Sequence, residues 1–392
     1  MLSLRVVQKL VEKPRATRID MKIIDKNAIK RFIRPWVEVI DGPLALIIFL
    51  ILTAGIVTLY SAGIDFPGRV QGQLRNIVVA FAVMWVAARV PPQTLMRFAV
   101  PLYVIGICLL LALFLPGLGI IKKGARRWLN LGLVIQPSEI MKIAMPMMLA
   151  WFFQKREGIV HWKEFLMAGV MLAIPVALIV KQPDLGTALL VMATGFYVIF
   201  LAGLSWKTIV GLFVAAAGSL PLIWPLLHDY QRQRVMTLLD PSSDPLGKGF
   251  HIIQSTIAVG SGGILGKGWL QGTQSHLEFI PERTTDFIFA VYSEEFGLIG
   301  NMVLLVLYLL LIARGVMIAS TASTIFTRLL AGAISLMFFT YVFVNMGMVS
   351  GILPVVGVPL PFVSYGGTSL VTLGLGTGIL MSIHRHRKLV QT

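Results

Sequence analysis

The sequence predicts an all-α integral membrane protein, a polytopic bundle of about ten transmembrane helices with one long extracytoplasmic loop. The chain of 392 residues is 56% hydrophobic and 13% charged, with a mean hydropathy of +0.82, which is more apolar surface than a soluble core could bury. Apolar runs of roughly 20 residues, enough to cross a membrane as a helix, recur along nearly the whole chain. The alternating pattern of barrel strands is absent from the sequence, so the spans are expected to be helices, which satisfy their own backbone hydrogen bonds.

The apolar runs divide the chain into a basic tail, a membrane domain and a short basic end. Residues 1–42 carry ten Lys or Arg and are too long and too charged for a cleavable signal peptide, so we expect a cytoplasmic tail. The membrane domain, 43–383, contains predicted spans at 43–62, 76–90, 98–117, 137–153, 164–180, 185–203, 208–228, 286–313, 329–350 and 366–383. An even number of spans also places the basic end, 384–392, in the cytoplasm, in agreement with the positive-inside rule.

The net charge of +16 comes mainly from residues that flank the apolar runs. Membrane topology and contact with anionic membrane lipids explain this distribution, so no nucleic-acid partner is predicted. The single cysteine, Cys108, lies inside an apolar run, which excludes an intrachain disulfide or a thiolate metal cluster and predicts a packing role.

Two outer segments depart from the expected charge and length. The turn after the third span holds Lys122, Lys123, Arg126 and Arg127 without an acidic residue, on the face where positive charge is normally scarce. An external anion would explain these residues; contact of a solvated loop with lipid headgroups is the alternative. The loop 229–285 is several times longer than any other connection, and its aromatic and aliphatic residues predict short interfacial or re-entrant helices.

Charged residues within or at the edge of spans are costly to bury, so each is a functional candidate. Glu139 and Lys142 share one helix face and can pair; an ion pair that only holds helices together is the alternative. Asp184 follows a proline and precedes a span, where capping of the next helix explains it equally well. Asp286 begins the eighth span at its outer end, and capping explains only part of its position.

The segment that leads into the last span, 351–369, is dense in Gly and Pro. Non-helical backbone at membrane depth survives only where it is buried in protein or lines a cavity. Gly366 and Gly367 open the span and could offer amide donors to an anion, with close helix packing as the equal alternative.

Five motifs occur in a fixed order along the chain. They are KGARRWL (123–129), QPSE (136–139), QPDLGTA (182–188), TDFIFA (285–290) and SYGG (364–367). Together they resemble the SEDS family, the shape, elongation, division and sporulation proteins of bacteria, and the similarity runs from about 43 to about 388. The stretch 349–361 is similar to the elongation branch rather than the division branch.

The resemblance implies ten transmembrane helices and a peptidoglycan glycosyltransferase that polymerises lipid II, the undecaprenyl-pyrophosphate-linked disaccharide peptide, at the outer face of the cytoplasmic membrane during cell elongation. It also implies a partner, a class B penicillin-binding protein transpeptidase, which crosslinks the product. The family's essential aspartate matches Asp286. Many members have a His directly before the Thr-Asp pair, where this chain has Thr284, so that His cannot be a required base here.

The chemistry of such a transfer suits a single carboxylate. Polymerisation converts an α-linked donor into a β-1,4 linkage, and inverting glycosidases use two carboxylates for this change. A diphosphate, however, leaves without protonation, so no second carboxylate is needed as an acid. Asp286 as general base, which typically raises a rate about 10²–10⁴-fold, is sufficient when cations bind the leaving group. A divalent cation, Mg²⁺ or Mn²⁺, could share that task, although no ligand cluster with recognisable spacing announces one.

The predicted site therefore surrounds one catalytic residue, Asp286. Its predicted substrate-binding residues are Lys122, Lys123, Arg126, Arg127, Glu139, Lys142, Asp184, Arg283, Ser364, Gly366 and Gly367. Two rival hypotheses remain at this point: a lipid II flippase or transporter, and a non-catalytic scaffold for the penicillin-binding protein.

Overall fold

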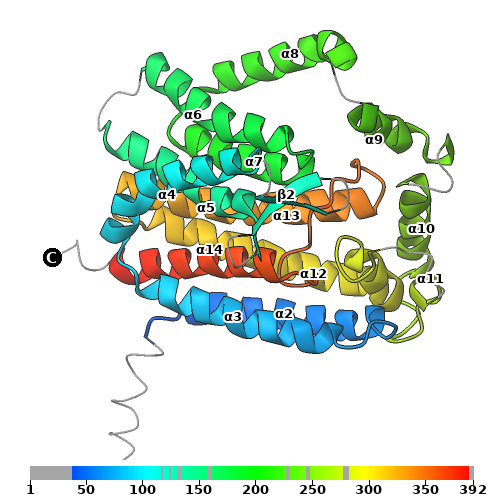
Figure 1. The fold of residues 1–392 in the computed structure, drawn as a ribbon. Helices are drawn as coiled ribbons and strands as arrows, with labels where there is room; N and C mark the ends of the chain where they lie inside the picture. The colour runs from blue at the N-terminus through cyan, green and yellow to red at the C-terminus, as the bar shows by residue number, and fades with distance from the viewer. Residues whose placement is uncertain are drawn as a thin grey trace, which may run out of the picture. The chain divides into compact units, whose positions relative to one another are not determined.

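The structure, a computed structural model, describes residues 38–115, 118–122, 125–130, 134–156, 161–226, 229–243, 248–276 and 282–387. The chain divides into two compact units, Met1–Glu38 and Val39–Thr392. Most of the predicted N-terminal tail lies outside the described residues. The second unit is a bundle of helices with one small sheet (Figure 1).

Ten helices of this unit correspond one to one to the predicted spans. They are α2 (Gly42–Ala62), α3 (Arg69–Arg89), α4 (Pro92–Ala112), α5 (Pro137–Gln154), α6 (Trp162–Val180), α7 (Leu185–Leu201), α8 (Trp206–Ile223), α12 (Ile288–Ser320), α13 (Ile325–Val349) and α14 (Gly367–His386). Among the described residues, seven helices are long and apolar enough to cross a membrane by length and composition, and α7 and most of α8 are shorter apolar helices. The predicted helical membrane fold is confirmed.

Several helix boundaries differ from the predicted ones because polar residues extend a helix beyond its apolar run. α3 begins at Arg69 rather than 76, and α4 begins at Pro92 rather than 98. Hydropathy locates only the part of a helix that suits hydrocarbon, whereas local chemistry sets where the helix starts. Pro92 is accepted at the first position of α4, because an N–H at that position would have no partner within the helix.

α5, α13 and α14 form the centre of the bundle. In the most apolar stretches of α13 and α14, 78% and 67% of the residues are buried, against at most 33% in the other long apolar helices, and 14 of the 18 residues of α5 are buried. Gly374 and Gly378 allow α14 to lie close to α3, because a Cβ there would stand 2.6 Å and 2.3 Å from the carbonyl oxygens of Ala80 and Met84. Small residues permit such close approach between membrane helices, which gain no hydrophobic driving force from lipid.

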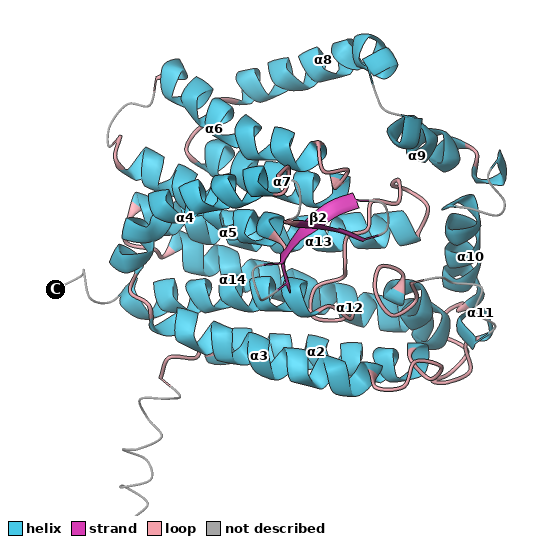
Figure 2. Cartoon of the chain, viewed as in Figure 1, coloured by secondary structure: helices cyan, strands magenta, loops and turns pink. Residues whose placement is uncertain are grey.

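A three-stranded antiparallel sheet, which the sequence did not predict, follows α4. Its strands are β1 (Gly119–Lys122), β2 (Ala125–Asn130) and β3 (Val134–Ile135), in the order β1-β2-β3. The basic turn is therefore a β-hairpin, and its central strand β2 lies near α5 (Figure 2). Strands this short carry too little alternation to be recognised in the sequence.

The long connection between α8 and α12 contains short helices, as predicted. They are α9 (Asp229–Leu239), α10 (Lys248–Ser261) and α11 (Thr273–His276), with the 3-10 turns η2 (Trp224–Leu226) and η3 (Pro241–Ser243). α10 packs against α12. The loop is thus fastened to the helix that follows Asp286.

The eighth predicted span is interrupted at Gly297, whose φ of 61° and ψ of −160° are not helical. The segment 263–268 fills this break, and within it the Lys267 N–H donates to the Glu294 carbonyl at 3.0 Å. The fully buried Glu294 carboxylate accepts from Lys267 Nζ at 2.6 Å and from the Thr273 N–H at 2.8 Å. Glu294 therefore fixes the loop to the first part of α12.

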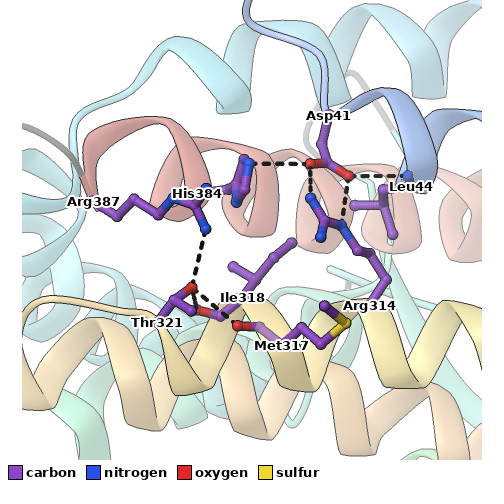
Figure 3. A network of polar contacts seen from close by, with 8 residues as sticks. All are labelled: Asp41, Leu44, Arg314, Met317, Ile318, Thr321, His384 and Arg387. Carbon is purple, nitrogen blue, oxygen red and sulfur yellow. Dashed lines mark hydrogen bonds and ion pairs between the residues drawn. The ribbon is translucent and has the colours of Figure 1, made fainter.

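Asp41 connects three helices at the end of the bundle where α12 and α14 finish (Figure 3). Its carboxylate caps α2 by accepting from the Leu44 N–H at 3.0 Å, and it accepts two hydrogen bonds from Arg314 of α12, at 3.0 Å and 2.5 Å. His384 of α14 lies 3.3 Å away. Burial alone would raise the pKa of the Asp41 carboxyl, but the hydrogen bonds and charge of Arg314 outweigh burial and hold that pKa below its ordinary value.

Candidate active site

A polar cavity of about 200 Å³ lies where the starts of α5, α7 and α14 meet strand β2. Charged and small residues from distant parts of the chain line it, among them Arg127, Glu139, Lys142, Asp184, Gly357 and Thr368. Four of the predicted substrate-binding residues are therefore neighbours in space, although they come from three separate elements.

One wall of the cavity contains a buried ion pair. Lys142 Nζ lies 2.6 Å from Glu139 Oε1 and donates to the Tyr341 hydroxyl at 2.7 Å. The Lys142 side chain is only 2% exposed, so its charge depends on this pair, since an unpaired buried ammonium is strongly disfavoured. Tyr341 belongs to α13, and the pair therefore joins α5 to α13.

A second part of the cavity lining is built around Asp184, which caps α7, one of the two roles considered for it. Its Oδ1 accepts from the Thr187 N–H at 3.2 Å, and its Oδ2 accepts from Gln136 Nε2 at 3.2 Å. Arg127 reaches over from β2, with Nε 3.9 Å from Asp184 Oδ2 and a hydrogen bond of 2.5 Å to the Pro183 carbonyl. Arg127 lines the cavity, and a third of its side chain is exposed, which makes it a candidate partner for an anion bound there.

Asp286 lies beside the cavity, next to Gly357. A Cβ built on Gly357 would stand 3.2 Å from Asp286 Oδ2, and Gly357 lines the cavity. Glycine leaves this space open for the carboxylate and adopts its φ of +76° without strain. The turn before α12 thus brings the Asp286 carboxylate to the cavity edge.

An apolar groove of about 860 Å³ adjoins the polar cavity. Its walls come from α3, α4, α5 and α14, and it shares Gln136, Glu139 and Thr368 with the cavity. Gly367 lies in the groove wall, where a Cβ would stand 3.0 Å from Asn76 Oδ1. Polar and apolar spaces therefore meet at the start of α14.

Three other predicted site residues lie away from the cavity lining. Arg283 is 4% exposed, donates to the Ala62 carbonyl at 3.0 Å and pairs with Asp65. Ser364 is buried, and its hydroxyl donates to the Thr285 carbonyl at 2.7 Å. Gly366 caps α14, and its N–H lies 3.4 Å from Gln73 Oε1 rather than facing the cavity as a free donor.

The remaining predicted cations are Lys122 in β1, Arg126 in β2 and Lys123. Lys123 lies outside the described residues, and the side chains of Lys122 and Arg126 are likewise not among those described. Their part in the site stays a prediction.

The structure adds site residues that the sequence did not single out. They are Gln136, Tyr341, Gly357, Thr368 and Ser369. Gln136 lies within one of the five motifs and could have been chosen there. Tyr341 interrupts an apolar run with a hydroxyl, the same kind of signal that selected the charged residues.

No group of three His, Cys, Asp or Glu that could hold a metal ion occurs in the part of the chain that the structure describes. Glu139 and Asp184 line the same cavity but are engaged by Lys142 and Gln136. At this cavity, the described residues could hold a cation together with ligands from a bound substrate, as Mg²⁺ is commonly held at phosphate sites.

Comparisons with known proteins identify relatives along nearly the whole chain. The family model of the FtsW, RodA and SpoVE cell cycle proteins matches residues 43–389. The peptidoglycan glycosyltransferase MrdB of Escherichia coli K12 is 52% identical over 353 residues, which cover 90% of this chain and 95% of MrdB. A probable peptidoglycan glycosyltransferase FtsW of Geobacter metallireducens is 40% identical over 316 residues, which cover 79% and 83% of the two chains.

Solved structures show the same fold. A chain from a study of how a peptidoglycan synthase complex coordinates polymerization and crosslinking matches with a TM-score of 0.77 and 36% identity, over 90% of this chain and 99% of that one. The rod shape determining protein RodA of Thermus thermophilus matches with a TM-score of 0.67 and 29% identity, over 88% and 97% of the two chains.

Proposed function

The chain belongs to the FtsW/RodA/SpoVE family, the SEDS family, and is a peptidoglycan glycosyltransferase of the RodA type; on that premise we propose that it polymerises lipid II with Asp286 as general base. One observation carries the proposal. Asp286 lies next to Gly357 at the edge of a polar cavity, and that cavity shares residues with an apolar groove. A base, a polar headgroup site and a place for a lipid tail are thus adjacent.

The proposed reaction joins two lipid-linked sugars. The 4-hydroxyl oxygen of the acceptor attacks the anomeric carbon of the donor, and the bond from that carbon to the phosphate oxygen breaks. The diphosphate leaves with the bonding electron pair, and the hydroxyl proton passes to the Asp286 carboxylate. Attack opposite the leaving group inverts the anomeric centre, and a diphosphate needs no acid to protonate it.

Positive charge at the cavity supports the departure of the diphosphate. The partly exposed Arg127 side chain can donate to phosphate oxygens, and its Nε lies 3.9 Å from Asp184 Oδ2, which helps to hold the guanidinium in place. Lys142 contributes charge from the wall but remains bound to Glu139. These fixed donors stabilise the growing negative charge of the leaving group. A divalent cation, if it assists, would bind the diphosphate together with Glu139 or Asp184.

The apolar groove suits the polyprenyl chain of the substrate. Its lining is mostly aliphatic, with Val79, Leu102, Ile140 and Val371 among its residues. A tail held there would leave its diphosphate at the shared residues of the polar cavity. We place this site at the outer membrane face and both termini in the cytoplasm, because the basic tails favour that orientation.

A class B penicillin-binding protein transpeptidase is the proposed partner. The support is the similar chain from a complex that coordinates polymerization with crosslinking. New strands must be crosslinked to strengthen a wall, so an enzyme that makes them benefits from a bound transpeptidase.

Purified protein in detergent, supplied with labelled lipid II, tests the proposal directly. We expect glycan strands to form with and without the partner protein. EDTA should abolish polymerisation only if a divalent cation takes part. Lipid II left uncoupled under all these conditions would favour a transporter or a scaffold, because neither needs to form a covalent product.

Arg127→Gln tests the diphosphate contact. We expect the KM for lipid II to rise about tenfold, the order of one charged hydrogen bond, in a protein that still folds but loses some thermal stability with the bond to the Pro183 carbonyl. Arg156→Gln is the matched control, because Arg156 forms an exposed pair with Glu164 at the far end of α5. An unchanged KM in Arg127→Gln would assign this arginine to the hairpin structure instead.

A further inference from the structure

The turn that carries Asp286 is held from outside through its main chain. Three successive carbonyls each accept a hydrogen bond from a residue within α13 or just before α14. The Tyr365 N–H donates to Thr284 at 2.9 Å, the Ser364 hydroxyl donates to Thr285 at 2.7 Å, and Asn345 Nδ2 donates to Asp286 at 2.9 Å.

We infer that Asn345 and Ser364 are positioning residues for the proposed base. They hold the turn that carries Asp286 against the segment that contains Gly357, Val358 and Leu360. The inference rests on the proposed function, since it concerns how that base is aimed. Both side chains are buried, with Asn345 0% and Ser364 5% exposed. They therefore act on a substrate only through the turn that they hold.

Asn345 joins the two sides of the site with one amide group. Its Nδ2 donates to the Asp286 carbonyl and also to the Val358 carbonyl, at 2.7 Å. Val358 follows Gly357, the residue beside the Asp286 carboxylate. The two amide hydrogens thus set the spacing between the base and the cavity edge.

Ser364 performs a similar task on the neighbouring peptide. Its hydroxyl donates to the Thr285 carbonyl and accepts from the Leu360 N–H at 2.8 Å. Gln73 of α3 in turn donates to the Ser364 carbonyl at 3.1 Å. The loop that holds the turn is therefore itself fixed to the bundle.

The turn needs such support because its backbone is strained. Glu282 has a φ of +56°, in the left-handed region that side chains other than glycine disfavour. Its carbonyl accepts from the N–H groups of Thr285 and Phe287, at 2.9 Å and 3.3 Å. A strained turn persists only where contacts with the surrounding structure hold it in place. Asn345 and Ser364 provide two such contacts, to the Asp286 and Thr285 carbonyls.

Removing either donor should move the base without removing it. A displacement of about 1 Å at a reacting group can lower a rate about 100-fold. We expect kcat for lipid II polymerisation to fall about 100-fold in Asn345→Leu and, by the same reasoning, about 10-fold in Ser364→Ala, with KM within about twofold of the native value. A residue that binds substrate would raise KM instead.

Two variants of buried residues provide matched controls. Thr340→Val removes a buried hydroxyl of α13 that bonds to Tyr197, and Ser335→Ala removes one that bonds to the Ala331 carbonyl of its own helix. Both should keep kcat within about twofold, because neither hydroxyl touches the turn. Thermal unfolding in detergent shows whether each variant is folded.

The outcomes separate the inference from the proposed function. A fall in kcat for Ser364→Ala that is larger than the change in its control, Ser335→Ala, supports the inference even if Asn345→Leu does not fold. Values of kcat equal to the controls, or a rise in KM alone, overturn it while leaving the base proposal intact. Native activity in Asp286→Asn would instead remove the base proposal, and the inference with it.

Discussion

Asp41 and Asp286 lie at opposite ends of the bundle and are held in different ways. Asp41 is fixed through its carboxylate, which binds the Leu44 N–H, Arg314 and His384 (Figure 3). The turn of Asp286 is fixed through its backbone carbonyls, and its carboxylate lies beside Gly357 at a cavity. The Asp41 carboxylate holds three helices together, whereas the main-chain hydrogen bonds of the Asp286 turn determine where its carboxylate lies at the cavity edge.

The pair between Glu139 and Lys142 provides the first way to test this contrast. In Lys142→Met, Glu139 loses its partner at 2.6 Å, so we expect the free energy of unfolding to fall by about 3 kcal/mol, as for other broken buried pairs. Polymerisation should fall roughly 100-fold, because the cavity wall and its charge change together. Thermal unfolding and the lipid II assay measure the two effects.

The double variant Glu139→Gln with Lys142→Met serves as its control. It removes both charges, so we expect it to recover most of the stability without recovering activity. Recovery of both properties would make the pair a purely structural contact, comparable to that of Asp41.

Gly357→Ala tests how close the cavity edge lies to Asp286, the proposed base. The new methyl group would stand 3.2 Å from Asp286 Oδ2 and should lower kcat about tenfold by displacing the carboxylate. Gly203→Ala is a close match, because its φ of +106° carries similar backbone strain with no neighbour within 4 Å. We expect both variants to lose roughly 1 kcal/mol of stability, and equal activities would disprove the proposed proximity.

Asp41→Asn should affect stability rather than catalysis. We expect the free energy of unfolding to fall by about 2 kcal/mol, less than for a fully buried pair because a fifth of the Arg314 side chain is exposed. Polymerisation at a permissive temperature should stay within about twofold of native. A large loss of kcat in a folded Asp41→Asn protein would connect the two ends of the bundle and contradict their separation.

The pH dependence of the Asp41 contribution gives the smallest effect. Its pKa is lower in the folded protein than the ordinary value of 3.8, so its stabilisation is present above that value and is lost as pH falls through the folded pKa. The difference in unfolding temperature between native and Asp41→Asn proteins should therefore shrink below about pH 4. A difference that grew in acid would reverse the sign of this linkage.

The fold was predictable because spans depend on local hydropathy. The position of Asp286 at the start of the eighth span was also readable from the sequence, and its catalytic role stays a proposal. The support of that acid was not predictable. Asn345 and Ser364 lie 59 and 79 positions from the residues they bind, and no local pattern joins them. The same limit applies to the break at Gly297, which is filled by a segment about 30 residues earlier in the chain.

The directions of side chains were a second feature that could not be predicted from the sequence. Arg283 lies three residues from Asp286, which made it a natural diphosphate partner, yet its guanidinium turns toward Asp65 and the Phe66 ring. Ser364 belongs to a recognised motif, but its hydroxyl holds a turn rather than facing the cavity. Sequence position places a residue near a site without showing which way it points.

The most direct test of the Asp286 assignment compares Asp286→Asn with Asp41→Asn in one lipid II polymerisation assay in detergent. The first variant should keep its native unfolding temperature and lose activity by about 10²–10⁴-fold, the usual contribution of a general base. The second should lose stability and keep its activity. Normal glycan strands from folded Asp286→Asn protein would contradict the assignment of Asp286 as the base.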